Sequence, residues 1–190
     1  MAAPVCVLLS ALVMFAEANY GADLAWKKTA ILQGEYWRLL TGHWLHLGWV
    51  HWAMNQLGLM LILWLFPQLL IKGRWVTGVV VIGLGVAGGL MFTELDGYVG
   101  MSGVLYGLVF YGCMIDNTLP FKIKCLVLAG VISKVVVEQL WPEVNAATAE
   151  QIGGMVAIDA HLFGSLSGFA LGGLAWFKQH RTEAAPKPVT

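Results

Sequence analysis

Apolar residues along the chain gather into long runs that short polar or proline-containing breaks separate. Six such runs lie at about residues 3–18, 48–66, 75–93, 99–115, 121–140 and 157–177. Most of them approach the roughly 20 residues that a membrane-spanning helix needs. The pattern predicts an all-α membrane protein, with one domain of six transmembrane helices over residues 1–190 and a short tail at 178–190.

The run at 3–18 is short and has a second interpretation, because a secretory signal peptide also contains a brief apolar stretch. A signal peptide normally carries basic residues before that stretch, and none stands there. We therefore expect residues 3–18 to form the first helix of the domain.

Composition agrees with a membrane protein. Hydrophobic residues make up 58% of the 190 positions and charged residues only 12%, and the mean hydropathy is +0.73. A lipid bilayer is therefore the expected surrounding, and with zero net charge and no basic block we expect no nucleic-acid partner. Cys6, Cys113 and Cys125 are scattered in apolar runs without a CxxC spacing, which is typical of packing residues.

Charges in the loops predict how the helices are oriented. Three segments carry the positive charges expected on the cytoplasmic side: Lys72 and Arg74, Lys122 and Lys124, and the tail with Lys178, Arg181 and Lys187. The intervening loops carry Asp23, Glu35, Glu94, Asp96, Glu143 and Glu150, with Lys27, Lys28 and Arg38 as their cations. Six helices with both termini in the cytoplasm satisfy every loop.

This topology brings polar side chains from three helices to one depth. The helices at 48–66, 99–115 and 157–177 all begin at the external face, and near their starts stand His51 and Asn55, Ser102, and His161. Polar groups at membrane depth are costly and usually functional. A neutral imidazole can take the proton of a serine hydroxyl, so Ser102 is a candidate nucleophile and His161 its base.

Attack on a peptide carbonyl produces an oxyanion, which needs hydrogen-bond donors already directed at it. Ser102 begins a predicted helix, so its backbone NH is unpaired and the helix dipole favours negative charge there. His51 and Asn55 lie four residues apart on one helix face and could add two side-chain donors. Hydrolysis also needs water, which predicts a water-filled cavity above Ser102, open to the outside. The mechanism calls for no metal and no cofactor.

Each of these residues also has a purely structural interpretation. Small residues around Ser102 could serve only helix packing, as Gly164, Gly168 and Gly172 do at four-residue intervals, and His161 could be a core histidine. Asp159 points to a different helix face from His161 and is expected to be a cap or interface residue. Lys134 either reaches the membrane surface or pairs with Glu138 one turn later. The joint arrangement of serine and histidine favours catalysis.

Four motifs, in this order along the chain, resemble those of the rhomboid intramembrane serine proteases. They are Trp37-Arg38, His51-x-x-x-Asn55, Gly100-Met101-Ser102-Gly103 followed by Tyr106, and Ala160-His161-x-x-Gly164-x-x-x-Gly168. The resemblance implies a six-helix rhomboid-like bundle, a Ser102/His161 dyad without a third acidic member, and an acyl-enzyme intermediate. It also implies oxyanion stabilisation by His51, Asn55 and the Ser102 backbone NH, and packing of Tyr106 against His161. Gly100, Met101, Gly103 and Gly164 would support the site.

The run from Trp37 to Leu47 resembles the rhombosortase branch of this family. That resemblance implies a bacterial inner-membrane protein with its active site toward the periplasm. Its partner would be a membrane-anchored substrate with a C-terminal GlyGly-type (GlyGly-CTERM) sorting signal. The helix at 121–140, with its run Val135-Val136-Val137, would be a candidate lateral gate.

Two other functions remain open from the sequence. His43, His46 and His51 fall within nine residues and could bind a metal or haem, although no carboxylate accompanies them and no HExxH motif is present. An inactive rhomboid-like protein that only binds transmembrane helices is the other alternative. The intact Ser102 and His161 argue against that second alternative.

Overall fold

The computed structural model describes residue 11 and residues 21–184. Helices dominate this part of the chain, which confirms the expected predominance of helix. In chain order the elements are β1 Trp26–Lys27, α2 Lys28–Leu32, α3 Arg38–Thr41, η1 Gly42–Trp44, α4 Trp49–Leu65, η2 Pro67–Gly73, α5 Arg74–Leu90, β2 Gly97–Tyr98, α6 Ser102–Ile115, α7 Phe121–Leu140, η3 Pro142–Asn145, α8 Ala146–Ile152 and α9 Ile158–Ala184.

Five of the predicted helices correspond to α4, α5, α6, α7 and α9. The bounds of α7 are those predicted, whereas α6 begins at Ser102 rather than 99 because Gly97–Tyr98 forms a strand. α9 continues to Ala184, beyond the predicted helix end at residue 177, and the cytoplasmic tail at 178–190 stays a prediction. The predicted helix at 3–18 lies outside the described residues, apart from residue 11.

Two helical stretches of the described chain, Pro67–Leu90 and Ile158–Gln179, are long and apolar enough to cross a membrane, and α6 is a shorter apolar helix. α7 has 20 residues but includes Lys122, Lys124, Lys134 and Glu138. The count of six spans and the cytoplasmic termini therefore stay predictions.

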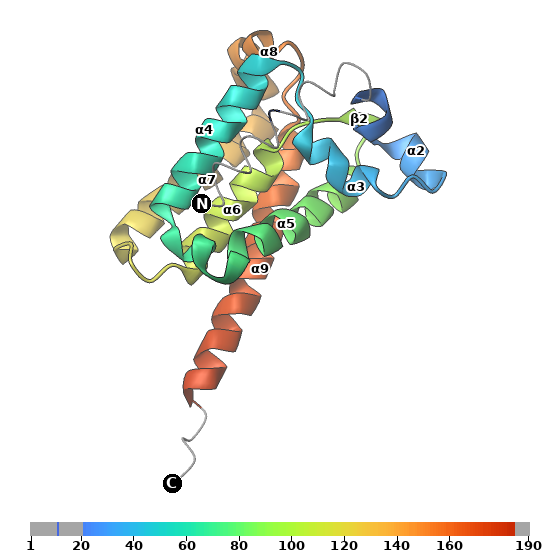
Figure 1. The fold of residues 1–190 in the computed structure, drawn as a ribbon. Coiled ribbons are helices and arrows are strands. Elements are labelled where there is room, and N and C mark those ends of the chain that lie inside the picture. The colour runs from blue at the N-terminus through green and yellow to red at the C-terminus, as the bar shows by residue number, and fades with distance from the viewer. Residues whose placement is uncertain (1–10, 12–20, 185–190) are drawn as a thin grey trace.

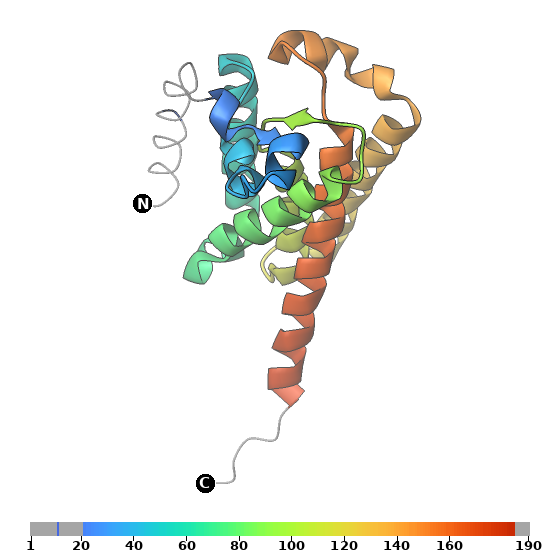
Figure 2. The ribbon, with the colours of Figure 1, turned by 90° about the vertical axis from the view of Figure 1, so that its right-hand side faces the viewer.

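The centre of the bundle is the contact between α6 and α9, which Figures 1 and 2 show side by side. Glycines make this contact close. A Cβ placed on Gly164 would lie 1.8 Å from the carbonyl oxygen of Gly103, and one on Gly168 would lie 2.0 Å from that of Gly107. The predicted packing role of Gly164, Gly168 and Gly172 is confirmed, the last lying against Met114.

The other long helices surround this pair. α5 packs against both α6 and α9, while Figure 2 shows α4 and α7 on opposite sides of them. α8 lies at the end of the bundle where α4 and α9 begin (Figures 1 and 2). All the helices that carry candidate residues therefore meet at one end.

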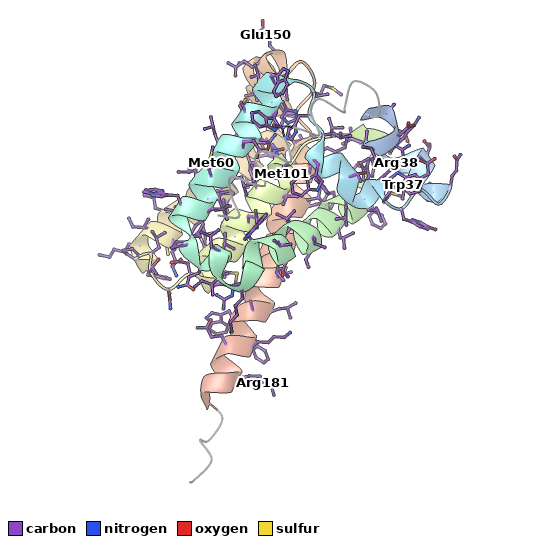
Figure 3. All side chains as sticks on the ribbon, in the orientation of Figure 1. Trp37, Arg38, Met60, Met101, Glu150 and Arg181 are labelled. Atoms are coloured by element: carbon purple, nitrogen blue, oxygen red, sulfur yellow. The ribbon has the colours of Figure 1, made fainter. Side chains whose placement is uncertain are left out.

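The segment before α4 forms a side structure that supports the loop leading to Ser102. Figure 3 shows Trp37 and Arg38 there, beside the bundle. The buried Arg38 guanidinium forms an ion pair with Glu35 at 2.6 Å and donates to the carbonyl oxygens of Ala22 and Ala25 at 2.8 Å. β1 pairs antiparallel with β2, with Trp26 opposite Tyr98. This region thereby holds the strand that ends four residues before Ser102.

Candidate active site

Ser102 and His161 are in direct contact. Ser102 is the first residue of α6 and His161 lies in the first turn of α9. The distance from Ser102 Oγ to His161 Nε2 is 2.9 Å, which is a hydrogen bond. The structure thus brings together the two residues that sequence analysis selected as nucleophile and base.

The turn before α6 explains how Ser102 is placed. Gly100 has φ +121°, a conformation that side chains rarely adopt, and a Cβ there would lie 2.7 Å from His51 Cε1. Its NH donates to Gly42 O at 3.0 Å, and its carbonyl oxygen accepts from the Tyr98 hydroxyl at 2.5 Å. The next residue, Met101, is fully buried. These contacts fix the turn that leads into Ser102, and the supporting role of Gly100 and Met101 stays a prediction.

His161 has two further partners. Its Nδ1 lies 2.8 Å from Glu138 Oε2, and its ring stacks on Tyr106 with centroids 4.1 Å apart and planes at 5°. A carboxylate only accepts hydrogen bonds, so Nδ1 carries the proton and Nε2 is left to accept from the Ser102 hydroxyl. The packing of Tyr106 is confirmed, but the expectation that His161 has no acidic partner is wrong.

Glu138 was missed because it lies on a different helix, 23 residues before His161. Sequence analysis connected it only with Lys134, and that pairing is confirmed at 2.7 Å between Nζ and Oε1. An ionisable residue inside an apolar run was the available signal. Asp159, closer in sequence, lies in the first turn of α9, and it is Glu138 that contacts the imidazole.

A cavity of about 260 Å³ opens beside Ser102 and His161. His51 and Asn55 line it from α4, while Thr148 and Ile152 line it from α8. A cavity therefore lies where one was predicted, while its water content and its opening to the outside stay predictions. A larger cavity of about 470 Å³ lies near the other end of α6 and has no serine, cysteine or histidine in its lining. Of these two cavities, only the smaller one is therefore lined by a serine and histidines.

His51 is held in a form that can donate. The NH of Leu47 donates to its Nδ1 at 3.3 Å, so a neutral His51 ring carries its proton on Nε2. Asn55 Nδ2 donates to the His51 carbonyl oxygen at 3.0 Å, which leaves the amide a second hydrogen. Both side chains are buried. The structure places them beside the serine without assigning them a role.

His43 and His46 are buried and face different neighbours. His43 Nε2 donates to Gly83 O at 2.9 Å, while the His46 ring meets His51 edge-on at 5.0 Å. Burial lowers the pKa of His43, and burial together with the proximity of His51 lowers the pKa of His46 to about 3. Within residues 11 and 21–184, no three histidine, cysteine or acidic side chains are grouped so that they could hold a metal ion. The histidine cluster of the metal alternative is therefore not assembled there.

Residues 33–177 match the protein family described as "Rhomboid domain". The chain belongs to the rhomboid family. A relative in Bacillus subtilis (strain 168), named "Putative rhomboid protease YdcA", is 31% identical over 155 residues, which cover 80% of this chain and 73% of that protein. The family acts on membrane-embedded substrates within the bilayer, and both matches support a rhomboid intramembrane serine protease. The matched range includes His51, Ser102 and Glu138.

Proposed function

We propose that this rhomboid is a serine endopeptidase that cleaves a transmembrane segment through Ser102 and His161. The observation that carries the proposal is the 2.9 Å contact between Ser102 Oγ and His161 Nε2 at the edge of a cavity. A serine is activated by a neighbouring base, and the base by a group that orients it. An inactive protein that only binds transmembrane helices would need neither a base beside Ser102 nor a group that orients that base.

In the first step, the Ser102 hydroxyl proton moves to His161 Nε2 as Oγ attacks the scissile carbonyl carbon. The resulting oxyanion is stabilised by the Ser102 backbone NH at the start of α6, together with His51 Nε2–H and Asn55 Nδ2–H. His161 then gives its proton to the leaving amine, which leaves an acyl-enzyme on Ser102. Water, deprotonated by His161, hydrolyses that ester and restores both residues.

The substrate of the proposal is a membrane-anchored protein with a GlyGly-type (GlyGly-CTERM) signal, cut near the periplasmic face of a bacterial inner membrane. Loop charges support this orientation: Arg181 and Glu150 lie at opposite ends of the molecule (Figure 3), and the positive end belongs in the cytoplasm. α7 is the proposed lateral gate, since Val135 and Glu138 are its only buried side chains. Six spans, with residues 3–18 as the first, complete the topology.

The test uses the purified protein in detergent with a transmembrane substrate that contains a Gly-Gly segment. We expect Ser102→Ala and His161→Ala each to reduce cleavage by about 10⁴-fold or more. Ser133→Ala, at an exposed position of α7, is the matched control and should cleave like the wild type.

Continued cleavage by both active-site variants would contradict the proposal. Cleavage of transmembrane substrates without a Gly-Gly segment, and failure to cut those that have one, would remove the substrate class and leave the nucleophile and base unaffected.

A further inference from the structure

Glu138 is an almost completely buried carboxylate, with 1% of its surface exposed. One oxygen, Oε2, contacts His161 Nδ1 at 2.8 Å, and the other, Oε1, forms the ion pair with Lys134 at 2.7 Å. A charge in such surroundings is costly unless partners stabilise it, so a purely accidental position is unfavourable. The carboxylate thus connects the base to a lysine.

We propose that Glu138 is a positioning residue that orients His161 and stabilises its protonated form during cleavage, which makes the site a Ser102-His161-Glu138 triad. The inference rests on the proposed protease function. By accepting from Nδ1–H, Glu138 keeps the proton off Nε2, the atom that must receive the proton of Ser102. When Nε2 is protonated, the negative carboxylate stabilises the positive ring. The proton on Nδ1 stays there throughout.

The alternative is that Glu138 only neutralises Lys134. The geometry argues against this, because the Lys134 side chain is 47% exposed and its ammonium also donates to Asn145 Oδ1 at 2.9 Å. A lysine that exposed can direct its charge to water or to the membrane surface without a carboxylate. Glu138 has no such route, since it is buried against the imidazole.

Lys134 does limit the size of the effect that we expect. In the serine protease triad, replacing the buried aspartate by asparagine lowers kcat by about 10⁴-fold. Here part of the carboxylate charge is balanced by the ammonium, and Tyr106 holds the imidazole face independently. For Glu138→Gln we therefore expect a smaller fall in kcat, by about 10- to 100-fold. KM should be unchanged, because Glu138 is 1% exposed and its two oxygens contact His161 and Lys134.

The decisive comparison adds the double variant Lys134→Met/Glu138→Gln, which removes both charges. If Glu138 only neutralised Lys134, the double variant would recover wild-type activity. If Glu138 positions His161, the double variant stays as slow as Glu138→Gln alone. Glu150→Gln, an exposed glutamate on α8 outside the cavity lining, is the matched control and should leave kcat unchanged.

A second measurement remains informative should Glu138→Gln fold poorly. Glu138→Ala leaves space beside the imidazole, and added formate can occupy it from the cavity and restore cleavage in proportion to its concentration. The rate at which a fluorophosphonate probe labels Ser102 should fall and recover in parallel.

Wild-type kcat in Glu138→Gln, or recovery in the double variant, would overturn the triad. So would labelling and cleavage by Glu138→Ala that do not respond to formate. Loss of activity in Ser102→Ala and His161→Ala would still support the protease in each of these cases, so the two proposals fail separately.

Discussion

The α6–α9 pair and α7 both supply residues to the site, but they are held in the bundle in different ways. α6 and α9 meet through glycines, and most of the α6 side chains are buried. α7 exposes most of its length and buries only Val135 and Glu138. Ser102 and His161 thus lie on helices that are in close backbone contact, while Glu138 lies on a helix with few buried side chains.

This difference separates two tasks. Ser102 Oγ and His161 Nε2, which are 2.9 Å apart, belong to the closely packed helices α6 and α9. The contact between Glu138 and Nδ1 forms only when α7 lies where the structure has it. If α7 acts as the lateral gate that we propose, its shift would separate the Glu138 carboxylate from His161.

Among the tests of this contrast, the largest loss of cleavage is expected from separating α6 and α9 with one methyl group. In Gly164→Ala the new Cβ would meet the Gly103 carbonyl oxygen at 1.8 Å, so α9 must move away. A displacement of about 1 Å near the chemistry can cost about 100-fold in rate. We expect cleavage to fall by at least about that factor, and the free energy of unfolding to fall by about 1–3 kcal/mol. Cleavage kinetics and unfolding in detergent measure both.

Gly130→Ala on α7 is the matched control for that variant. A Cβ at Gly130 has no neighbour within 4 Å, and alanine favours helix over glycine by about 1 kcal/mol. Its stability and cleavage should equal or exceed those of the wild type. Equal losses in the two variants would show that the contrast between the helices is false.

Truncating one leucine on each helix tests the same contrast through stability alone. Leu108 of α6 is 0% exposed and Leu126 of α7 is 69% exposed. Because lipid is as apolar as leucine, only lost packing counts. Leu108→Ala should lower the free energy of unfolding by about 2–4 kcal/mol, and Leu126→Ala by less than about 0.5 kcal/mol. Denaturant unfolding of both variants gives the values.

A large loss for Leu126→Ala would indicate that another helix covers this face of α7. The picture of α7 as the loosely packed helix would then have to be abandoned.

Much of the fold was predictable because membrane helices leave a strong apolar signal. The α7 bounds agree with the prediction, and Ser102, His161, His51 and Asn55 were selected correctly as neighbours because topology alone places the starts of their helices at one face. The strand at Gly97–Tyr98 was missed, since two residues of antiparallel pairing have no periodic pattern.

Glu138 could not be predicted as a partner of His161 for a different reason. Sequence spacing predicts contacts within one helix, such as Lys134 with Glu138, because residues four apart share a face. The contact with His161 depends on how α7 rotates and leans against α9, which packing decides. The family resemblance even led to the opposite expectation, a histidine without an acidic partner.

The smallest effect that we expect comes from removing the contact that α6, rather than α7, makes with His161. Tyr106 stacks on the imidazole at 4.1 Å, and aromatic pairs of this kind contribute about 0.5–1.5 kcal/mol beyond burial. Tyr106→Leu should therefore lower kcat by roughly 3- to 10-fold, whereas Tyr106→Phe, which keeps the stacked ring, should not.

Combining Tyr106→Leu with Glu138→Gln measures whether the two contacts act together. A joint loss greater than the product of the single losses would show that either helix alone can hold His161, and a purely multiplicative loss would show that each contributes separately.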